Sequence, residues 1–185
     1  MEERFTAAFA DKLRAKRKRK VGKIWHVDET YIKVKGQWCY LYRGLDQDGN
    51  LVDSRLSKQR DMAAAKAFFA QAQELAGQAP ERVTTDGHTP YPRAIAEVLG
   101  PEVKHERVSC CANPIEQDHR GIKQRYYPLL GFKDFTAAQR FCRAFEEVRQ
   151  FLRPRQFMGQ FVSLAQRRAH VLKRVEELHN LFAPV

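Results

Sequence analysis

Long hydrophobic runs are missing from this sequence, and so are the features of an exported chain. No apolar run approaches the roughly 18 residues that span a bilayer. The first twenty residues, "MEERFTAAFADKLRAKRKRK", carry Glu2, Glu3 and Asp11 and contain no apolar segment ahead of a cleavage site, unlike a secretory signal. The composition is globular, with 43% hydrophobic residues in a chain of 185. We expect one compact cytoplasmic domain with tails and no membrane contact.

Cysteines are few and are not spaced as metal ligands. The four (Cys39, Cys110, Cys111 and Cys142) form no C-x-x-C pair, and the adjacent Cys110 and Cys111 suit neither a zinc site nor an easy disulfide. We interpret them as reduced and structural. A redox or metal role for the adjacent pair is the less favoured alternative.

Acidic residues are scarce relative to basic ones. The chain has 33 Lys and Arg against 22 Asp and Glu, a formal charge of +11. Such a field attracts polyanions, which makes nucleic acid the leading class of partner, although many basic proteins are merely soluble. The bases are densest in "KLRAKRKRKVGK", which follows a helix expected to end near Leu13. We predict that residues 1–22 form a basic tail that is mobile until phosphates neutralise it, or else a solvated linker. The candidate DNA contacts there are Lys16, Arg17, Lys18, Arg19 and Lys20.

The middle of the chain alternates between strand and helix patterns. Two or three antiparallel strands fit residues 23–56, with turns at Lys35-Gly36 and at "DQDGN". A helix capped by Asp61 and stopped by Gly77 follows. Then come a short strand in "ERVTTDG", a short helix in "PYPRAIAEVLG", a strand in "PEVKHERVS", and helices at about 114–126, 134–151 and 159–182. Strands followed by alternating strands and helices indicate an α/β fold, a mixed sheet flanked by helices.

The stretch "NPIEQDHRGIKQR", residues 113–125, begins a helix in which Asn113 is the expected cap and Pro114 the first residue. At about 100° per residue, Ile115, Ile122 and Tyr126 form a narrow stripe that can face the core.

The two flanks of this stripe differ. Glu116, Arg120 and Lys123 share one edge, and Asp118 with Arg125 occupies the other, which we interpret as an ordinary exposed pair. Glu116 alone is explained by the helix dipole. His119, close to the stripe, is better explained as a packed histidine than as a metal ligand.

Two further acids stand where strands meet turns. Asp28 lies within "WHVDETY" and Asp86 within "TTDG". Each has an ordinary explanation, an edge-strand pair for Asp28 and turn formation for Asp86. An acid in an apolar strand is costly unless something pairs with it, however, and a divalent cation is one candidate. Together with Glu116 they suggest a carboxylate cluster.

Four blocks of sequence, in order, resemble the catalytic core of bacterial transposases of the insertion-sequence six family. They are "WHVDETYIKVKGQWCYLYRGLDQDGNLVD", "SKQRDMAAAKAFF", "TTDGHTPYPRAIAE" and "NPIEQDHRGIKQRYYPLLGFKDFTAAQRF". The resemblance covers residues 23–155. It implies an RNase H-like fold with a mixed five-stranded sheet, and a bacterial protein whose partners are the element ends and target DNA.

The resemblance also implies a site. Asp28, Asp86 and Glu116 would hold two Mg²⁺ ions, with Mn²⁺ as a substitute, and would catalyse DNA strand cleavage followed by strand transfer. Lys123, seven residues after Glu116, would face DNA together with Arg120. Members of the family carry a helix-turn-helix region ahead of the core, and only about twenty residues precede it here, so we expect a shortened copy. A DNA-binding remnant without catalysis, or a nuclease acting on RNA–DNA hybrids, are the alternatives.

The last segment, residues 156–185, is predicted to form a helical extension. Apolar residues recur there at intervals of three and four with one base among them, at Phe161, Leu164, Arg168, Val171, Val175, Leu178 and Phe182. This seam favours packing back on the domain. A homodimer contact is the alternative.

Overall fold

The computed structural model of the protein describes residues 2–17, 20–108, 114–153 and 162–182, without the side chains of residues 2–7, 114, 116, 117 and 182. Its strands are β1 Ile24–Val34, β2 Gln37–Asp46, β3 Leu51–Ser57, β4 Arg82–Thr85 and β5 Lys104–Arg107. Its helices are α1 Glu2–Arg17, α2 Met62–Ala76, α3 Pro90–Val98, α4 Pro114–Tyr126, α5 Phe135–Leu152 and α6 Leu164–Phe182, with a short 3₁₀ turn, η2 Tyr127–Leu129, after α4.

The five strands form one mixed sheet in the order β3-β2-β1-β4-β5. The first three strands are antiparallel neighbours, whereas β4 pairs parallel with both β1 and β5. The predicted turn at Lys35-Gly36 joins β1 to β2, and both residues have positive φ, 49° and 79°. This is the backbone that a tight two-residue hairpin needs. The predicted mixed five-stranded sheet is confirmed.

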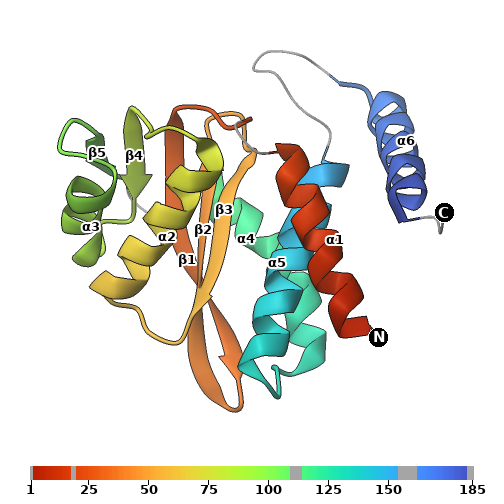
Figure 1. The fold of residues 1–185 in the computed structure, drawn as a ribbon, viewed down its shortest axis with the longest axis horizontal. Coiled ribbons are helices and arrows are strands. Elements are labelled where there is room, and N and C mark those ends of the chain that lie inside the picture. The colour runs from red at the N-terminus through yellow and green to blue at the C-terminus, as the bar shows by residue number, and fades with distance from the viewer. Residues whose placement is uncertain (1, 18–19, 109–113, 154–161, 183–185) are drawn as a thin grey trace.

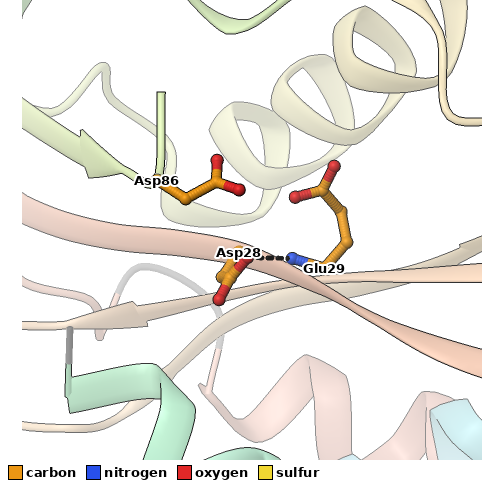
Figure 2. A group of neighbouring side chains, drawn as sticks. All are labelled: Asp28, Glu29 and Asp86. Carbon is orange, nitrogen blue, oxygen red and sulfur yellow. Dashed lines mark hydrogen bonds between the residues drawn. The ribbon is translucent and has the colours of Figure 1, made fainter. Parts of the chain in front are cut away.

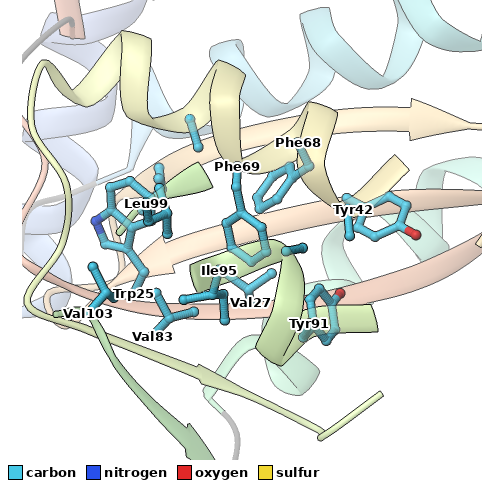
Figure 3. Close-up of a cluster of buried hydrophobic side chains, with 14 of the residues drawn as sticks. Trp25, Val27, Tyr42, Phe68, Phe69, Val83, Tyr91, Ile95, Leu99 and Val103 are labelled. Atoms are coloured by element: carbon cyan, nitrogen blue, oxygen red, sulfur yellow. The ribbon is translucent and has the colours of Figure 1, made fainter. Parts of the chain in front are cut away.

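Helices cover both faces of the sheet (Figure 1): α2 and α3 lie on one face, α4 and α5 on the other, and α1 packs against α5. Successive side chains of a strand point to opposite faces, so β1 supplies Trp25 and Val27 to the first face and Ile32 and Val34 to the second. Figure 3 shows the first of these clusters, in which aromatic rings from β2, α2 and α3 meet. Its largest members are Trp25, Tyr42, Phe68, Phe69, Tyr91 and Ile95.

Local sequence signals set the ends of α2 as expected. The Asp61 carboxylate accepts a hydrogen bond of 2.8 Å from the backbone N–H of Ala64, and Gly77 ends the helix with φ of 75°. Asp134 caps α5 in the same way through the N–H of Ala137. These short-range interactions are visible in sequence because both partners lie within one turn.

The N-terminal segment differs from the expectation. Instead of ending near Leu13 and giving way to a loose basic run, α1 continues to Arg17. Arg14 donates to both carboxylate oxygens of Asp53 on β3, and Arg17 donates from Nε to Glu147 on α5 at 2.6 Å. Leu13 is buried beneath them. Partners far away in sequence therefore fix α1 to the domain.

The final helix, α6, begins later than predicted, at Leu164. The guanidinium of Arg174 lies 4.8 Å from the ring centre of Phe151 on α5. The apolar seam is largely open: Leu164 and Val175 are 64% and 48% exposed, and Phe161 lies outside the described residues. No helix within the described part of the chain is long and apolar enough to cross a membrane.

Candidate active site

Asp28 stands in the middle of β1, directly opposite Arg43 of β2 in the antiparallel register. Its side chain is buried, and its Oδ1 accepts a hydrogen bond of 2.8 Å from the backbone N–H of Glu29. The alternation of β1 directs Asp28 to the face covered by α4 and α5. The acid predicted from the sequence is thus held by a central strand.

Asp86 follows the end of β4. The parallel register aligns His26 with Thr84, and two more residues along each strand bring Asp86 level with Asp28. Gly87, with φ of 87°, turns the chain immediately afterwards. The Oδ1 atom of Asp86 accepts a hydrogen bond of 3.0 Å from the backbone N–H of His88, which fixes the carboxylate at the edge of the sheet.

A third acid, Glu29, joins these two. One ligand atom from each of Asp28, Glu29 and Asp86 lies within 4.8 Å of the others, and Figure 2 shows Asp28 and Glu29 side by side on β1 with Asp86 near them at the end of β4. Sequence reasoning missed Glu29, because a residue next to Asp28 in a strand points to the other face. The only available signal was a second consecutive acid in an otherwise apolar strand.

The three carboxylates suit a hard divalent cation. Mg²⁺ and Mn²⁺ prefer carboxylate oxygens, and the three acids place such oxygens close together. The Oε2 atom of Glu29 is buried and has no hydrogen-bond partner among the described residues. The residues present therefore fit a bound metal ion.

Arg60, in the loop between β3 and α2, bridges two of the acids. Its Nε donates to Glu29 Oε1 at 2.9 Å, and its Nη2 lies 3.3 Å from Asp86 Oδ2. Burial by itself would lower the pKa of Arg60, but the hydrogen bond and charge of Glu29 outweigh it and raise that pKa. The guanidinium is a permanent positive charge within the acidic cluster.

The helix expected to carry the third ligand is α4, which packs against β1. The predicted stripe is confirmed, since Ile115, Ile122 and Tyr126 are all buried. Glu116 falls in the first turn of α4, the end of the helix that follows β5, and its side chain lies outside the described residues. The predicted cap, Asn113, also lies outside them.

Asp118 is not the exposed partner of Arg125 that we expected. Its side chain is 6% exposed and receives hydrogen bonds from Arg43 and, at 2.6 and 2.7 Å, from Arg149 on α5. Burial would raise the pKa of Asp118, but these guanidiniums lower it. The helical wheel placed Asp118 on the correct flank, but it could not show that arginines from β2 and α5 cover that flank.

His119 is buried, in agreement with the packed histidine that we predicted. Burial, with smaller contributions from the positive charges of Arg43 and Lys123, lowers the pKa of His119 to about 3. The imidazole is therefore neutral at physiological pH.

The predicted DNA-facing bases fall into different environments. Arg120 is exposed and Lys123 half-buried on α4, while Lys16 and Lys20 are exposed near the end of α1. Arg17 is instead occupied by Glu147 and by the carbonyl oxygens of β3, so we correct its assignment from DNA contact to structural ion pair. Two other predicted contacts, Lys18 and Arg19, lie outside the described residues.

Solved structures share this arrangement. The catalytic core of HTLV-2 integrase, solved in complex with magnesium, superposes with a TM-score of 0.52 at 18% identity, over 75% of this chain and 91% of that one. A chain of the simian T-cell lymphotropic virus intasome, solved in complex with the PP2A regulatory subunit B56 gamma, gives the same TM-score at 13% identity, over 89% of this chain and 57% of that one. The sheet order and flanking helices are those of the RNase H-like fold.

Sequence comparisons place the chain within this class. A family model described as a DDE domain matches residues 22–155. The transposases of the elements IS431mec and IS257, both from Staphylococcus aureus, are 42% identical over 105 residues. An uncharacterized protein of Yersinia pseudotuberculosis is 34% identical over 89 residues, 47% of this chain and 80% of that protein. The chain belongs to the DDE transposase family, of the type found in IS431 and IS257. The match covers 55% of this chain and 46% of each staphylococcal transposase, about half of their length.

Proposed function

We propose that this chain is the catalytic core of a transposase that cuts DNA at the ends of an insertion sequence and joins the freed 3′ ends to target DNA. The observation that carries the proposal is the meeting of Asp28 and Asp86 at neighbouring parallel strands, with their ligand atoms within 4.8 Å. Family membership supplies the reaction class.

In this proposal Asp28, Asp86 and Glu116 hold the metal ions. When bound, two Mg²⁺ or Mn²⁺ ions activate a water or a 3′-hydroxyl and stabilise the leaving oxygen of an in-line attack on a phosphodiester. Asp28 is the rigid ligand, because β1 is hydrogen-bonded on both sides. Asp86 is more exposed than Asp28 and is reached from solvent. Glu116, in the first turn of α4, would supply the remaining carboxylate.

Bases on α4 would hold the DNA. Arg120 and Lys123 lie about one and two turns beyond Glu116, so they can neutralise phosphates next to the bond that is cut.

A second basic surface would extend the contact. Lys16 of α1 and Lys20, which follows α1, line a hollow together with Arg153 at the end of α5 and Arg174 of α6. Glu147 also lines it, but that carboxylate is already paired with Arg17. The outward bases of this hollow replace Arg17 as the N-terminal DNA contact in our proposal.

The test is a joining assay. The protein would be incubated with labelled duplexes carrying the element's own terminal repeats, a plasmid target, and Mg²⁺ or Mn²⁺. We expect joined product from the unmodified protein and none from Asp86→Asn. The matched control is Asp48→Asn, which makes the same chemical change at an exposed turn acid and should keep activity.

The alternative is a DNA-binding remnant without catalysis. It predicts that the unmodified protein and the Asp86→Asn variant retain the duplex equally in a gel-shift assay and that neither yields product. That result would rule out the catalytic proposal for this chain.

A further inference from the structure

The acidic cluster already contains a cation that belongs to the protein. Arg60 contacts Glu29 through Nε and Asp86 through Nη2, so a single guanidinium spans two of the three acids that could hold a metal ion. Arg60 itself is about three-quarters buried, with 27% of its side chain exposed. This is tighter confinement than a surface ion pair has.

We propose that Arg60 is a built-in counter-ion of the metal site, which holds Asp86 and Glu29 together in the metal-free protein and competes with the divalent cation for Asp86. The inference rests on the proposed function, because it assumes that Asp86 is a metal ligand. It assigns to Arg60 and Glu29 the new role of positioning residues.

The contact of Arg60 with Glu29 is shorter and more deeply buried than its contact with Asp86. The guanidinium can therefore stay bound to Glu29 when a metal ion binds Asp86. The contact to Glu29 is 2.9 Å, and the Glu29 side chain is 2% exposed; the contact to Asp86 is 3.3 Å, and the Asp86 side chain is 28% exposed. A charge-assisted hydrogen bond is stronger when it is short and shielded from water. A cation can therefore take Asp86 from Arg60 while Glu29 keeps the guanidinium nearby.

Repulsion among the three carboxylates explains why a positive charge at this position is useful. Three carboxylates within 4.8 Å repel one another strongly when no cation is present. Arg60 offsets one of the three negative charges, which stabilises the metal-free fold. The same positive charge must weaken binding of a divalent cation, since like charges repel at this range. Removing it should make the site bind cations more tightly and fold less well without them.

The test measures Mn²⁺ binding directly, without activity, from the electron paramagnetic resonance signal of the free ion. We expect Arg60→Gln to bind Mn²⁺ about tenfold more tightly than the unmodified protein, a change of the size that one nearby charge produces. Arg60→Lys, which keeps the charge, should stay close to the unmodified affinity. Arg55→Gln is the matched control, because Arg55 on β3 contacts Gln71 and none of the three acids.

A thermal melt provides the second readout. The midpoint of Arg60→Gln should lie below that of the unmodified protein without metal, and saturating Mn²⁺ should raise it by more than it raises the unmodified protein. In Asp86→Asn, Arg60 and Mn²⁺ no longer compete for a carboxylate at position 86. Adding Arg60→Gln to this variant should therefore change Mn²⁺ affinity far less than Arg60→Gln changes it in the unmodified protein.

Unchanged or weaker Mn²⁺ binding in Arg60→Gln would overturn the inference, as would an equal gain in Arg55→Gln. The proposed function fails separately. A protein that binds Mn²⁺, responds to Arg60→Gln as expected and yet joins no DNA supports the counter-ion and contradicts the transposase activity. If the unmodified protein joins DNA and Arg60→Gln does not change Mn²⁺ affinity, the transposase activity is supported and the counter-ion role is contradicted.

Discussion

Arg43 of β2 donates a hydrogen bond to Asp118 of α4, and this contact joins the helix that carries Glu116 to the strand next to Asp28. Arg43 lies opposite Asp28 in the sheet, and Asp118 follows Glu116 by two residues. Arg43 also donates to Glu146 of α5 at 2.9 Å. Burial would lower the pKa of Arg43, but the charges of Glu146 and Asp118 raise it. The ion pair thus fixes α4 to the sheet next to the site.

Replacing Arg43 should be costly. Arg43→Met leaves Glu146 buried without its guanidinium, so we expect the free energy of unfolding to fall by about 3–5 kcal/mol. Urea unfolding followed by circular dichroism measures it. Lys23→Met, which breaks an exposed pair with Glu81, should cost less than about 1 kcal/mol. Similar losses in both variants would show that Arg43 is not a structural centre.

The neighbours Lys16 and Arg17 should behave differently despite their equal charge. Arg17→Gln removes two hydrogen bonds to the buried Glu147 and should lower the free energy of unfolding by about 2–4 kcal/mol. Lys16→Gln should change stability by less than about 1 kcal/mol and weaken DNA binding instead. Unfolding and gel-shift titrations on both variants check this. Equal stability of the two variants would restore Arg17 to the DNA surface.

His119 should make the protein acid-sensitive. Its pKa is about 3 in the folded protein, below its ordinary value of about 6.5, so the unfolded chain takes up a proton first as the pH falls. The stability due to the neutral imidazole is complete above pH 6.5 and is lost progressively toward pH 3. It amounts to about 2 kcal/mol between pH 6.5 and pH 5. His119→Gln should lack this part of the decline in urea unfolding at several pH values, and an identical pH profile would refute the assignment.

Lys123 should contribute one phosphate contact. Lys123→Ala is expected to weaken binding of all DNA sequences equally and to flatten the slope of log affinity against log salt by about one. Fluorescence anisotropy at several salt concentrations measures the slope. The matched control is Lys66→Ala, because Lys66 on α2 is paired with Glu97 on the opposite face of the sheet. An unchanged slope in Lys123→Ala would remove this residue from the DNA surface.

Much of the fold was predictable because its signals are short in range. Asp61 and Gly77 mark the ends of α2 through contacts within one turn, and Lys35-Gly36 marks a hairpin through its own backbone angles. The alternation of apolar residues predicted two or three antiparallel strands within residues 23–56, where β1, β2 and β3 lie. The mixed five-stranded sheet followed from the resemblance and is confirmed by the structure, which adds the order of the strands.

The misjudged residues all have partners far away along the chain. Asp118 meets Arg43 across 75 residues, Arg17 meets Glu147 across 130, and Glu29 meets Arg60 across 31. A helical wheel or a strand pattern gives the direction of a side chain but not what lies opposite it. The error is largest for charged residues, because they can be buried only where a partner of opposite charge lies next to them.

Acidic and basic side chains differ in how often they are buried. Among the described residues, the buried charged side chains comprise seven acids (Asp28, Glu29, Asp46, Asp53, Asp118, Glu146 and Glu147) and a single base, Arg43. Arg14, Arg17 and Arg149 reach inward to these acids from the periphery. Burial therefore removes more acids than bases from the surface, and the remaining side chains carry a larger positive excess than the chain as a whole. If DNA binds as proposed, it meets a surface on which bases outnumber acids by more than the formal charge of the chain indicates.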